Sequence, residues 1–104
     1  MNILQEAEFR KIANQLTFNQ EKFTSQVISE KDGQKIILFV FAQGQGLKTH
    51  TTSSPALLLV LEGSCCFTIY GKEQDLKPGE NIRIPANEPH SVMATIDCKV
   101  VLIK

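Results

Sequence analysis

Hydrophobic and polar positions follow a strand pattern from about residue 24 to the end of the chain. Long apolar runs, rich in β-branched and aromatic residues, are KIILFVFA (35–42), ALLLVLE (56–62) and KVVLIK (99–104). Such runs predict buried strands. Shorter runs that predict further strands are TSQVIS (24–29), LKTHTT (47–52), CCFTIY (65–70), NIRIP (81–85) and HSVMATI (90–96). KIILFVFA hardly alternates, which indicates burial on both faces, as between a core and a partner surface.

Turn residues separate these runs at short intervals. Asp32-Gly33 is the pair expected in a tight hairpin turn, and Pro78-Gly79 suits a type II turn. Pro85 and Pro89 fix φ at two positions of one loop, so that loop is expected to be rigid. Many short strands joined by turn signals indicate a β-sandwich or β-barrel. The predicted fold class is therefore all-β.

The first 23 residues have a different pattern. Apolar residues recur roughly at helical spacing, and they are Leu4, Phe9, Ile12, Ala13 and Leu16. This spacing predicts a short N-terminal helix, and a lead-in strand is expected around Thr17–Asn19. A chain of 104 residues suffices for one compact domain. We expect a single domain over residues 1–104, with the helix and lead-in strand in 1–23 and the barrel in 24–104.

Charge and hydropathy exclude several classes of partner. Eleven basic and eleven acidic side chains give a formal net charge of zero. Such a balance does not favour nucleic acid or an anionic membrane surface. The apolar runs, of which 36–42 is the longest, are too short to cross a bilayer. MNILQEAEFRK has no basic region followed by an apolar stretch, so no signal peptide is expected. We expect a cytoplasmic protein without a nucleic-acid or membrane partner.

The three cysteines are Cys65, Cys66 and Cys98. An odd number without regular spacing does not indicate a disulfide framework. We expect reduced thiols that pack as small hydrophobic side chains. Adjacent residues of a strand point to opposite faces. One of Cys65 and Cys66 is thus expected to face the interior of the fold, and the alternation does not decide which.

The spacing of one group of residues resembles the first motif of the cupin family. That motif reads Gly, five residues, His, one residue, His, three or four residues, Glu, six residues, Gly. Here Gly44 precedes His50 by the motif's interval, and Gly63 stands at the closing glycine. The segment LLLVLEG (57–63) also looks like a strand and turn of the family.

A second group resembles the second cupin motif, which reads Gly, five residues, Pro, one residue, Gly, two residues, His, three residues, Asn. Gly79, Pro85 and His90 are in that register, within KPGENIRIPANEPHSV (77–92). The resemblance covers residues 36–104. It implies a cupin barrel, also called a double-stranded β-helix or jelly roll, but this fold hosts many activities.

The chain departs from both motifs at the positions that carry chemistry. Thr52 stands where the family has its second histidine, and Ala56 replaces the glutamate. Asn87 and Ala94 replace the glycine and asparagine of the second motif. In metal-binding cupins the two first-motif histidines, the glutamate and the second-motif histidine hold one ion. Two of those four ligands are missing here.

The remaining metal candidates are His50 and His90. Zinc and iron sites in enzymes normally use three protein ligands. Cys66 could add a thiolate if it faces inward near His50. The expected cofactor is none, or a weakly bound divalent metal ion on His50 and His90. Taken singly, each histidine could instead be a hydrogen-bonded residue of the core or rim.

We expect a ligand pocket inside the barrel. Its predicted lining residues are His50, Thr52, His90, Cys66 and Met93, although plain barrel packing also explains Thr52 and Met93. The two imidazoles are the only histidines of the chain. A pair of them could hold a carboxylate or phosphate, or respond to pH. The pattern thus favours a small, partly apolar ligand with one acidic or polar end.

Three functions compete on this sequence. The first is a small cupin barrel that binds a small molecule, in a sensing or accessory role, without a complete metal site. The alternative is a metal-dependent cupin enzyme of the isomerase, decarboxylase or dioxygenase type, with a non-standard third ligand beside His50 and His90. No nucleophile–base–acid set is recognisable, so no catalytic residue is predicted. The third is association of copies, and a homodimer is expected because KIILFVFA has no polar face.

Overall fold

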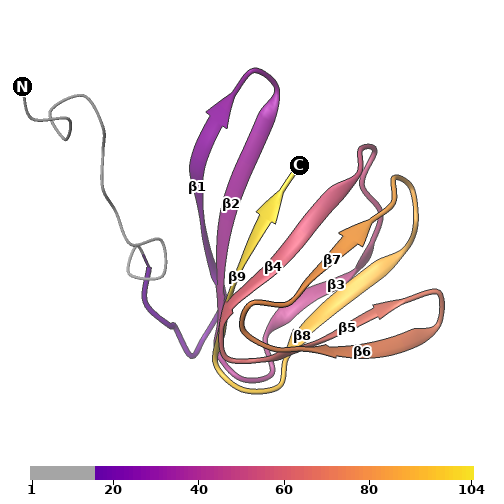
Figure 1. Cartoon of the computed structure of the whole chain (residues 1–104). Coiled ribbons are helices and arrows are strands. Elements are labelled where there is room, and N and C mark those ends of the chain that lie inside the picture. Colours follow the sequence, from indigo (N-terminus) through magenta and orange to yellow (C-terminus); the bar gives the residue numbers. More distant parts are fainter. Residues whose placement is uncertain (1–15) are drawn as a thin grey trace, which may run out of the picture.

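The computed structural model describes residues 16–104, which form two antiparallel sheets packed face to face (Figure 1). The five-stranded sheet, sheet A, has the order β1-β2-β9-β4-β7, and the four-stranded sheet, sheet B, has the order β3-β8-β5-β6. The all-β prediction is confirmed. The strands are β1 (Thr24–Lys31), β2 (Gln34–Phe41), β3 (Gly46–His50), β4 (Ala56–Glu62), β5 (Cys65–Ile69), β6 (Lys72–Leu76), β7 (Asn81–Ile84), β8 (His90–Ala94) and β9 (Cys98–Ile103).

The chain passes repeatedly from one sheet to the other, which gives a jelly-roll arrangement. The β3–β4 and β7–β8 connections both cross between the sheets at one end of the sandwich. The backbone N–H of Asn87 donates to the carbonyl oxygen of Thr52 at 2.7 Å and ties these two loops together. We call this the loop end of the sandwich. The strand ends His50, Ala56, Ile84 and His90 lie there.

The main core lies between the two sheets. Strand alternation explains its composition, because every second residue of a strand points inward. In β4, Ala56, Leu58 and Val60 are buried, whereas the residues between them point to the outer face. The buried members of the core cluster are Phe41, Ala56, Leu58, Val60, Cys65, Phe67, Leu76, Ile84, Val92, Ala94, Cys98, Val100 and Leu102.

A second apolar cluster covers part of the outer face of sheet A. Leu38, Val40 and Val101 are buried there, and Leu16 and Phe18 pack against them. The run KIILFVFA is therefore buried on both faces partly by its own chain. Its inner residues join the core, and the segment before β1 covers its outer residues.

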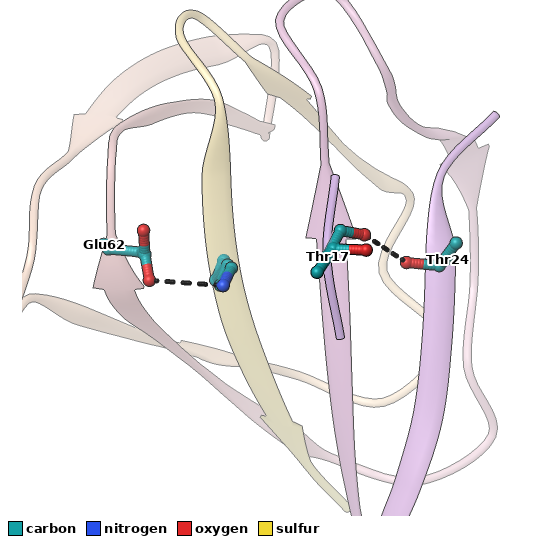
Figure 2. A network of polar contacts seen from close by, with 4 residues as sticks. Thr17, Thr24 and Glu62 are labelled. Carbon is teal, nitrogen blue, oxygen red and sulfur yellow. Dashed lines mark hydrogen bonds and ion pairs between the residues drawn. The ribbon is translucent and has the colours of Figure 1, made fainter. Parts of the chain in front are cut away.

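Polar contacts hold the lead-in segment on this face. The Thr24 hydroxyl donates to the carbonyl oxygen of Thr17 at 3.5 Å (Figure 2). The ammonium group of Lys99 lies 5.1 Å from the centre of the Phe18 ring, a cation–π contact. The same ammonium group is 3.5 Å from a carboxylate oxygen of Glu62. The aliphatic part of the Lys99 side chain is thus covered, and the charge of its ammonium group is compensated by Glu62 and the Phe18 ring.

Both predicted turns are present. Asp32 and Gly33 have φ values of 54° and 81°, as the type I′ turn between β1 and β2 requires. The N–H of Glu80 donates to the carbonyl oxygen of Lys77 at 2.9 Å, and φ of Gly79 is 87°. These values fit the expected type II turn.

Two expectations about the elements were wrong or incomplete. Residues 17–19 form no strand, because this segment packs through its side chains and lies outside both sheets. Strand β6 was not predicted, because its sequence KEQDL is polar and only Leu76 is buried. Such a pattern is typical of an edge strand. The predicted helix at residues 4–16 falls almost wholly outside the described residues. In the described range, 16–104, no helix has the length and apolar character of a membrane span.

Candidate two-histidine site

The two histidines meet across neighbouring strands of sheet B. His50 ends β3 and His90 begins β8, and the two are direct register partners. The pairing is irregular between Leu47 and His50, because three steps along β3 match only two steps along β8. This β-bulge decides the direction of His50. Leu47 faces the core, so regular alternation would point the third residue after it outward, and the extra residue turns His50 to the same face as His90.

The two rings lie against each other. Their centres are 4.4 Å apart and their planes are inclined by 58°. Phe67 of β5 stacks on the other side of His90, with ring centres 5.8 Å apart and planes inclined by 18°. His90 is buried, with 6% of its surface exposed, whereas His50 is half-buried. His90 is therefore the buried ring of the pair, stacked on Phe67, and His50 is the ring nearer the solvent.

Backbone carbonyl groups set the tautomer of both rings. Nδ1 of His50 is 2.7 Å from the carbonyl oxygen of Lys48, and Nδ1 of His90 is 2.8 Å from that of Glu88. A carbonyl oxygen only accepts hydrogen bonds, so each Nδ1 must carry the hydrogen. In a neutral ring the lone pair is then on Nε2. Each ring of the pair thus presents its Nε2 as a hydrogen-bond acceptor.

The positions around the pair do not complete a transition-metal site. Ala56 has no ligating atom, and the Thr52 hydroxyl donates to the carbonyl oxygen of Ser54 at 2.9 Å. Among residues 16–104 no group of three or more histidine, cysteine, aspartate or glutamate side chains is placed to bind one metal ion. Two imidazoles fall short of the three protein ligands usual for zinc or non-haem iron. The residues present therefore do not fit the metal site that the cupin resemblance implies.

Two of the five predicted pocket residues lie on the other face of sheet B. Cys66 and Met93 are register partners, and they alternate with the buried residues Cys65, Phe67 and Val92. Side chains of successive strand residues point to opposite faces. Cys66 therefore cannot serve as a ligand beside His50. Of the two adjacent cysteines, Cys65 is the one that faces the core.

Cys66 and Met93 instead line a hollow of about 490 Å³ on the outer face of sheet B. Met93 is 52% exposed there. Burial raises the pKa of the Cys66 thiol, and the carboxylates of Glu73 and Asp75 raise it further. This thiol is therefore a weak nucleophile and a weak metal ligand at neutral pH.

A second hollow of about 480 Å³ lies at the edge of sheet A and reaches Leu57, Ile103 and Arg83. Arg83 is exposed and pairs with Leu57, whereas Ile82 and Ile84 turn toward the core. Arg83 therefore points to the outer face of sheet A. No histidine lines either hollow.

Sequence reasoning missed two features of the histidine pair. Phe67 was not singled out, although its strict alternation with Cys65 along β5 could have placed it inward beside His90. The bulge at Lys48 and Thr49 had no signal, because neither glycine nor proline marks it. The carbonyl groups that orient the rings belong to the residues two positions before each histidine, so the two halves of the site have the same local form.

Comparison with known proteins gives one family. The family model described as the cupin domain matches residues 37–104. A conserved protein of unknown function from Streptococcus pyogenes superposes with a TM-score of 0.85 at 22% identity, over 93% of this chain and 85% of that one. A cupin superfamily protein from Desulfitobacterium hafniense has a TM-score of 0.81 at 24% identity, over 86% and 82% of the two chains.

A cupin 2 conserved barrel domain protein from Leptotrichia buccalis reaches 30% identity with a TM-score of 0.81. The match covers 88% of this chain and 44% of that longer chain. Comparison with curated protein sequences gives no match. Because the family model matches well over half of the residues and the structures share the two-sheet architecture, the chain belongs to the cupin family.

Proposed function

We propose that this cupin binds a small organic molecule against the His50–His90 pair, in a sensing or accessory role. The observation that carries the proposal is the pair of Nδ1–H groups bonded to carbonyl oxygens, which leaves Nε2 of each ring as an acceptor in a pair whose ring centres are 4.4 Å apart. Accessible polar atoms that lack an internal partner, in otherwise apolar surroundings, are the usual recognition groups of a ligand site. In the described part of the chain, the imidazoles have only these two carbonyl groups as hydrogen-bond partners.

The tautomers define the chemistry of the polar end of the ligand. Two Nε2 acceptors match a hydroxyl, phenol or amine group that donates hydrogen bonds. In this tautomer Nε2 offers a carboxylate or phosphate no hydrogen-bond donor. The surroundings of the pair are apolar, because Phe67 stacks on His90 and the core residues Ala56 and Ile84 lie at the loop end. The proposal thus narrows the acidic or polar end expected from the sequence to a hydrogen-bond donor.

The test measures the binding of three probes, phenol, benzyl alcohol and benzoate, to untagged protein. Binding is measured by ligand-observed NMR above pH 7.5. We expect the two hydroxyl probes to bind and benzoate to bind at least tenfold more weakly. His50→Ala and His90→Ala each remove one acceptor and should weaken phenol binding roughly tenfold, as expected for one buried hydrogen bond. Ser91→Ala, on the outer face of sheet B beside His90, is the matched control and should bind as the parent does.

Three outcomes would overturn the proposal. The first is phenol binding that is unchanged in the double variant His50→Ala/His90→Ala. The second is a long-range ¹H–¹⁵N spectrum that places the hydrogen of both rings on Nε2. The third is stoichiometric iron, zinc, manganese or nickel in the untagged protein that is lost in the same double variant. That last result would favour the metal-dependent enzyme.

We also propose that two copies associate through the outer face of sheet A. Leu57 and Leu59 of β4 point outward and are half-buried, and the lead-in segment at Leu16 and Phe18 packs over β2 and β9 instead. A strand that is apolar on both faces is normally covered on both. A twofold dimer would pack this remaining strip of each copy on that of the other.

Light scattering after size-exclusion chromatography tests the association. We expect the mass of a dimer at micromolar concentration, and the mass of a monomer for Leu59→Glu. Thr68→Glu places the same charge on the outer face of sheet B and should leave the dimer intact. A parent protein that elutes as a monomer at micromolar concentration contradicts the proposal.

A further inference from the structure

Two buried thiols meet at the end of the sandwich away from the histidine pair. Cys65 begins β5 of sheet B, and Cys98 begins β9 of sheet A. Both side chains are 0% exposed and belong to the core cluster. We propose that Cys65 and Cys98 are an oxidation site: a peroxide converts them to a disulfide that joins the two sheets. The proposal does not depend on the function assigned to His50 and His90.

The backbone holds the starts of these two strands together. The N–H of Thr95 donates to the carbonyl oxygen of Ser64 at 3.1 Å, and the hydroxyl groups of the same two residues are 2.6 Å apart. The α-carbon of Gly63 lies so close to Cys98 that a Cβ on it would be 2.7 Å from the Cys98 Cα. The segments leading into Cys65 and Cys98 are thus in direct contact at this end of the core.

The two thiols already interact. The Cys98 thiol donates a hydrogen bond to the Cys65 sulfur, and this bond lowers the pKa of Cys65 although burial and Asp75 act in the opposite direction. The same hydrogen bond, together with burial, raises the pKa of Cys98. Cys65 is therefore the better nucleophile of the pair, and Cys98 is the thiol that stays protonated. This division of roles is the one that disulfide formation requires.

The oxidation balances with hydrogen peroxide as the oxidant. The Cys65 thiolate attacks one peroxide oxygen, the O–O bond breaks, and the departing hydroxide takes a proton to become water. Cys65 is then a sulfenic acid. The sulfur of Cys98 attacks the Cys65 sulfur and displaces hydroxide, which takes the Cys98 proton and becomes a second water. Two electrons pass from the two sulfurs to the peroxide, and one S–S bond forms.

Cys66 supplies an internal comparison. It is adjacent to Cys65 in sequence but points to the outer face of sheet B, and its pKa is raised. Access to solvent alone would make Cys66 the first thiol to react. Thiol pairing would make Cys65 and Cys98 react together and leave Cys66 reduced.

The disulfide would act at a distance from the histidines. In β5 and β8, Cys65 pairs with Ala94 and Ile69 pairs with His90, so the two sites occupy opposite ends of the same strand pair. The bond would close a loop that contains β5, β6, β7 and β8. A cross-link over a loop of this size restricts the unfolded chain strongly. We expect the unfolding midpoint to rise by roughly 10 °C.

The experiment uses Cys66→Ala, which retains only the two thiols in question. The protein is treated with hydrogen peroxide, the peroxide is destroyed with catalase, and the protein is denatured in guanidinium with N-ethylmaleimide. Mass spectrometry should show the loss of two hydrogen atoms and no maleimide. The same sample reduced first should carry two maleimides. The midpoint of unfolding should rise on oxidation and return on reduction.

Cys98→Ala is the matched variant. It should show no internal disulfide and no rise of the midpoint, and circular dichroism checks that it folds. Should it not fold, Cys66→Ala decides the question by itself. Two maleimides on the peroxide-treated Cys66→Ala protein overturn the proposal. So do oxygen adducts without a cross-link, or disulfides found only between chains.

Discussion

Gly63→Ala is expected to lower the free energy of unfolding by roughly 4 kcal/mol or more, which is a large part of the stability of an ordinary protein. The glycine has a φ of 75°, in the left-handed region that other residues rarely occupy. A Cβ there would collide with the carbonyl oxygen of Asp97 and lie 2.7 Å from the Cα and Cβ of Cys98. These contacts are with backbone and a buried residue, so no flexible side chain can move to relieve them.

Gly79→Ala separates the strain of a positive φ from the steric overlap of the added Cβ. Its φ of 87° is equally unfavourable for alanine, but nothing lies within 4 Å of the added Cβ. We expect it to cost about 1–2 kcal/mol, from backbone strain alone. Urea denaturation followed by circular dichroism measures both variants. A Gly63→Ala protein as stable as Gly79→Ala would show that the close approach to Asp97 is not a constraint in solution.

Phe67→Ala is expected to lower the free energy of unfolding by about 3–5 kcal/mol. Phe67 is 1% exposed and lies in the middle of β5, between the two sheets. Removing its ring creates a cavity in the core and also removes the stacking partner of His90. The variant should therefore lose stability and, in the fraction that stays folded, show a shifted and broadened His90 ring signal by NMR.

Two companion variants make this result specific. Thr68→Ala changes the next residue of the same strand, which points to the outer face, and should cost less than about 1 kcal/mol. Phe67→Leu fills most of the cavity without an aromatic face, so it should recover much of the stability but not the His90 signal. A loss below about 1.5 kcal/mol for Phe67→Ala would contradict the packing described for this core.

The elements of the fold were largely readable from local pattern. Eight of the nine strands found in residues 16–104 coincide with runs selected for apolar or alternating character, because the side chains of a strand with one buried face must alternate. The turns at Asp32-Gly33 and Pro78-Gly79 follow from residues that permit positive φ. Strand β6, which was not predicted, has polar residues on both faces and forms only because the edge of β5 is free to pair with it. The pattern of hydrophobic residues along the sequence does not predict such a strand.

The candidate site was readable only in part. The motif spacing brought His50 and His90 together correctly, but it could not tell which face Cys66 and Met93 occupy. A strand shifted by one residue sends every side chain to the opposite face. Face assignments therefore depend on the register with neighbouring strands, which is a property of the whole sheet.

The amino-acid sequence by itself determined that this chain is an all-β cupin and that its motifs lack two of the usual metal ligands. Tertiary structure alone decided that an unmarked bulge turns His50 toward His90, that two carbonyl groups set both ring tautomers, and that Cys65 meets Cys98. Periodicity and turn chemistry are properties of neighbouring residues, so they can be read along the chain. Contacts between strands far apart in sequence exist only after the sheets have paired and packed.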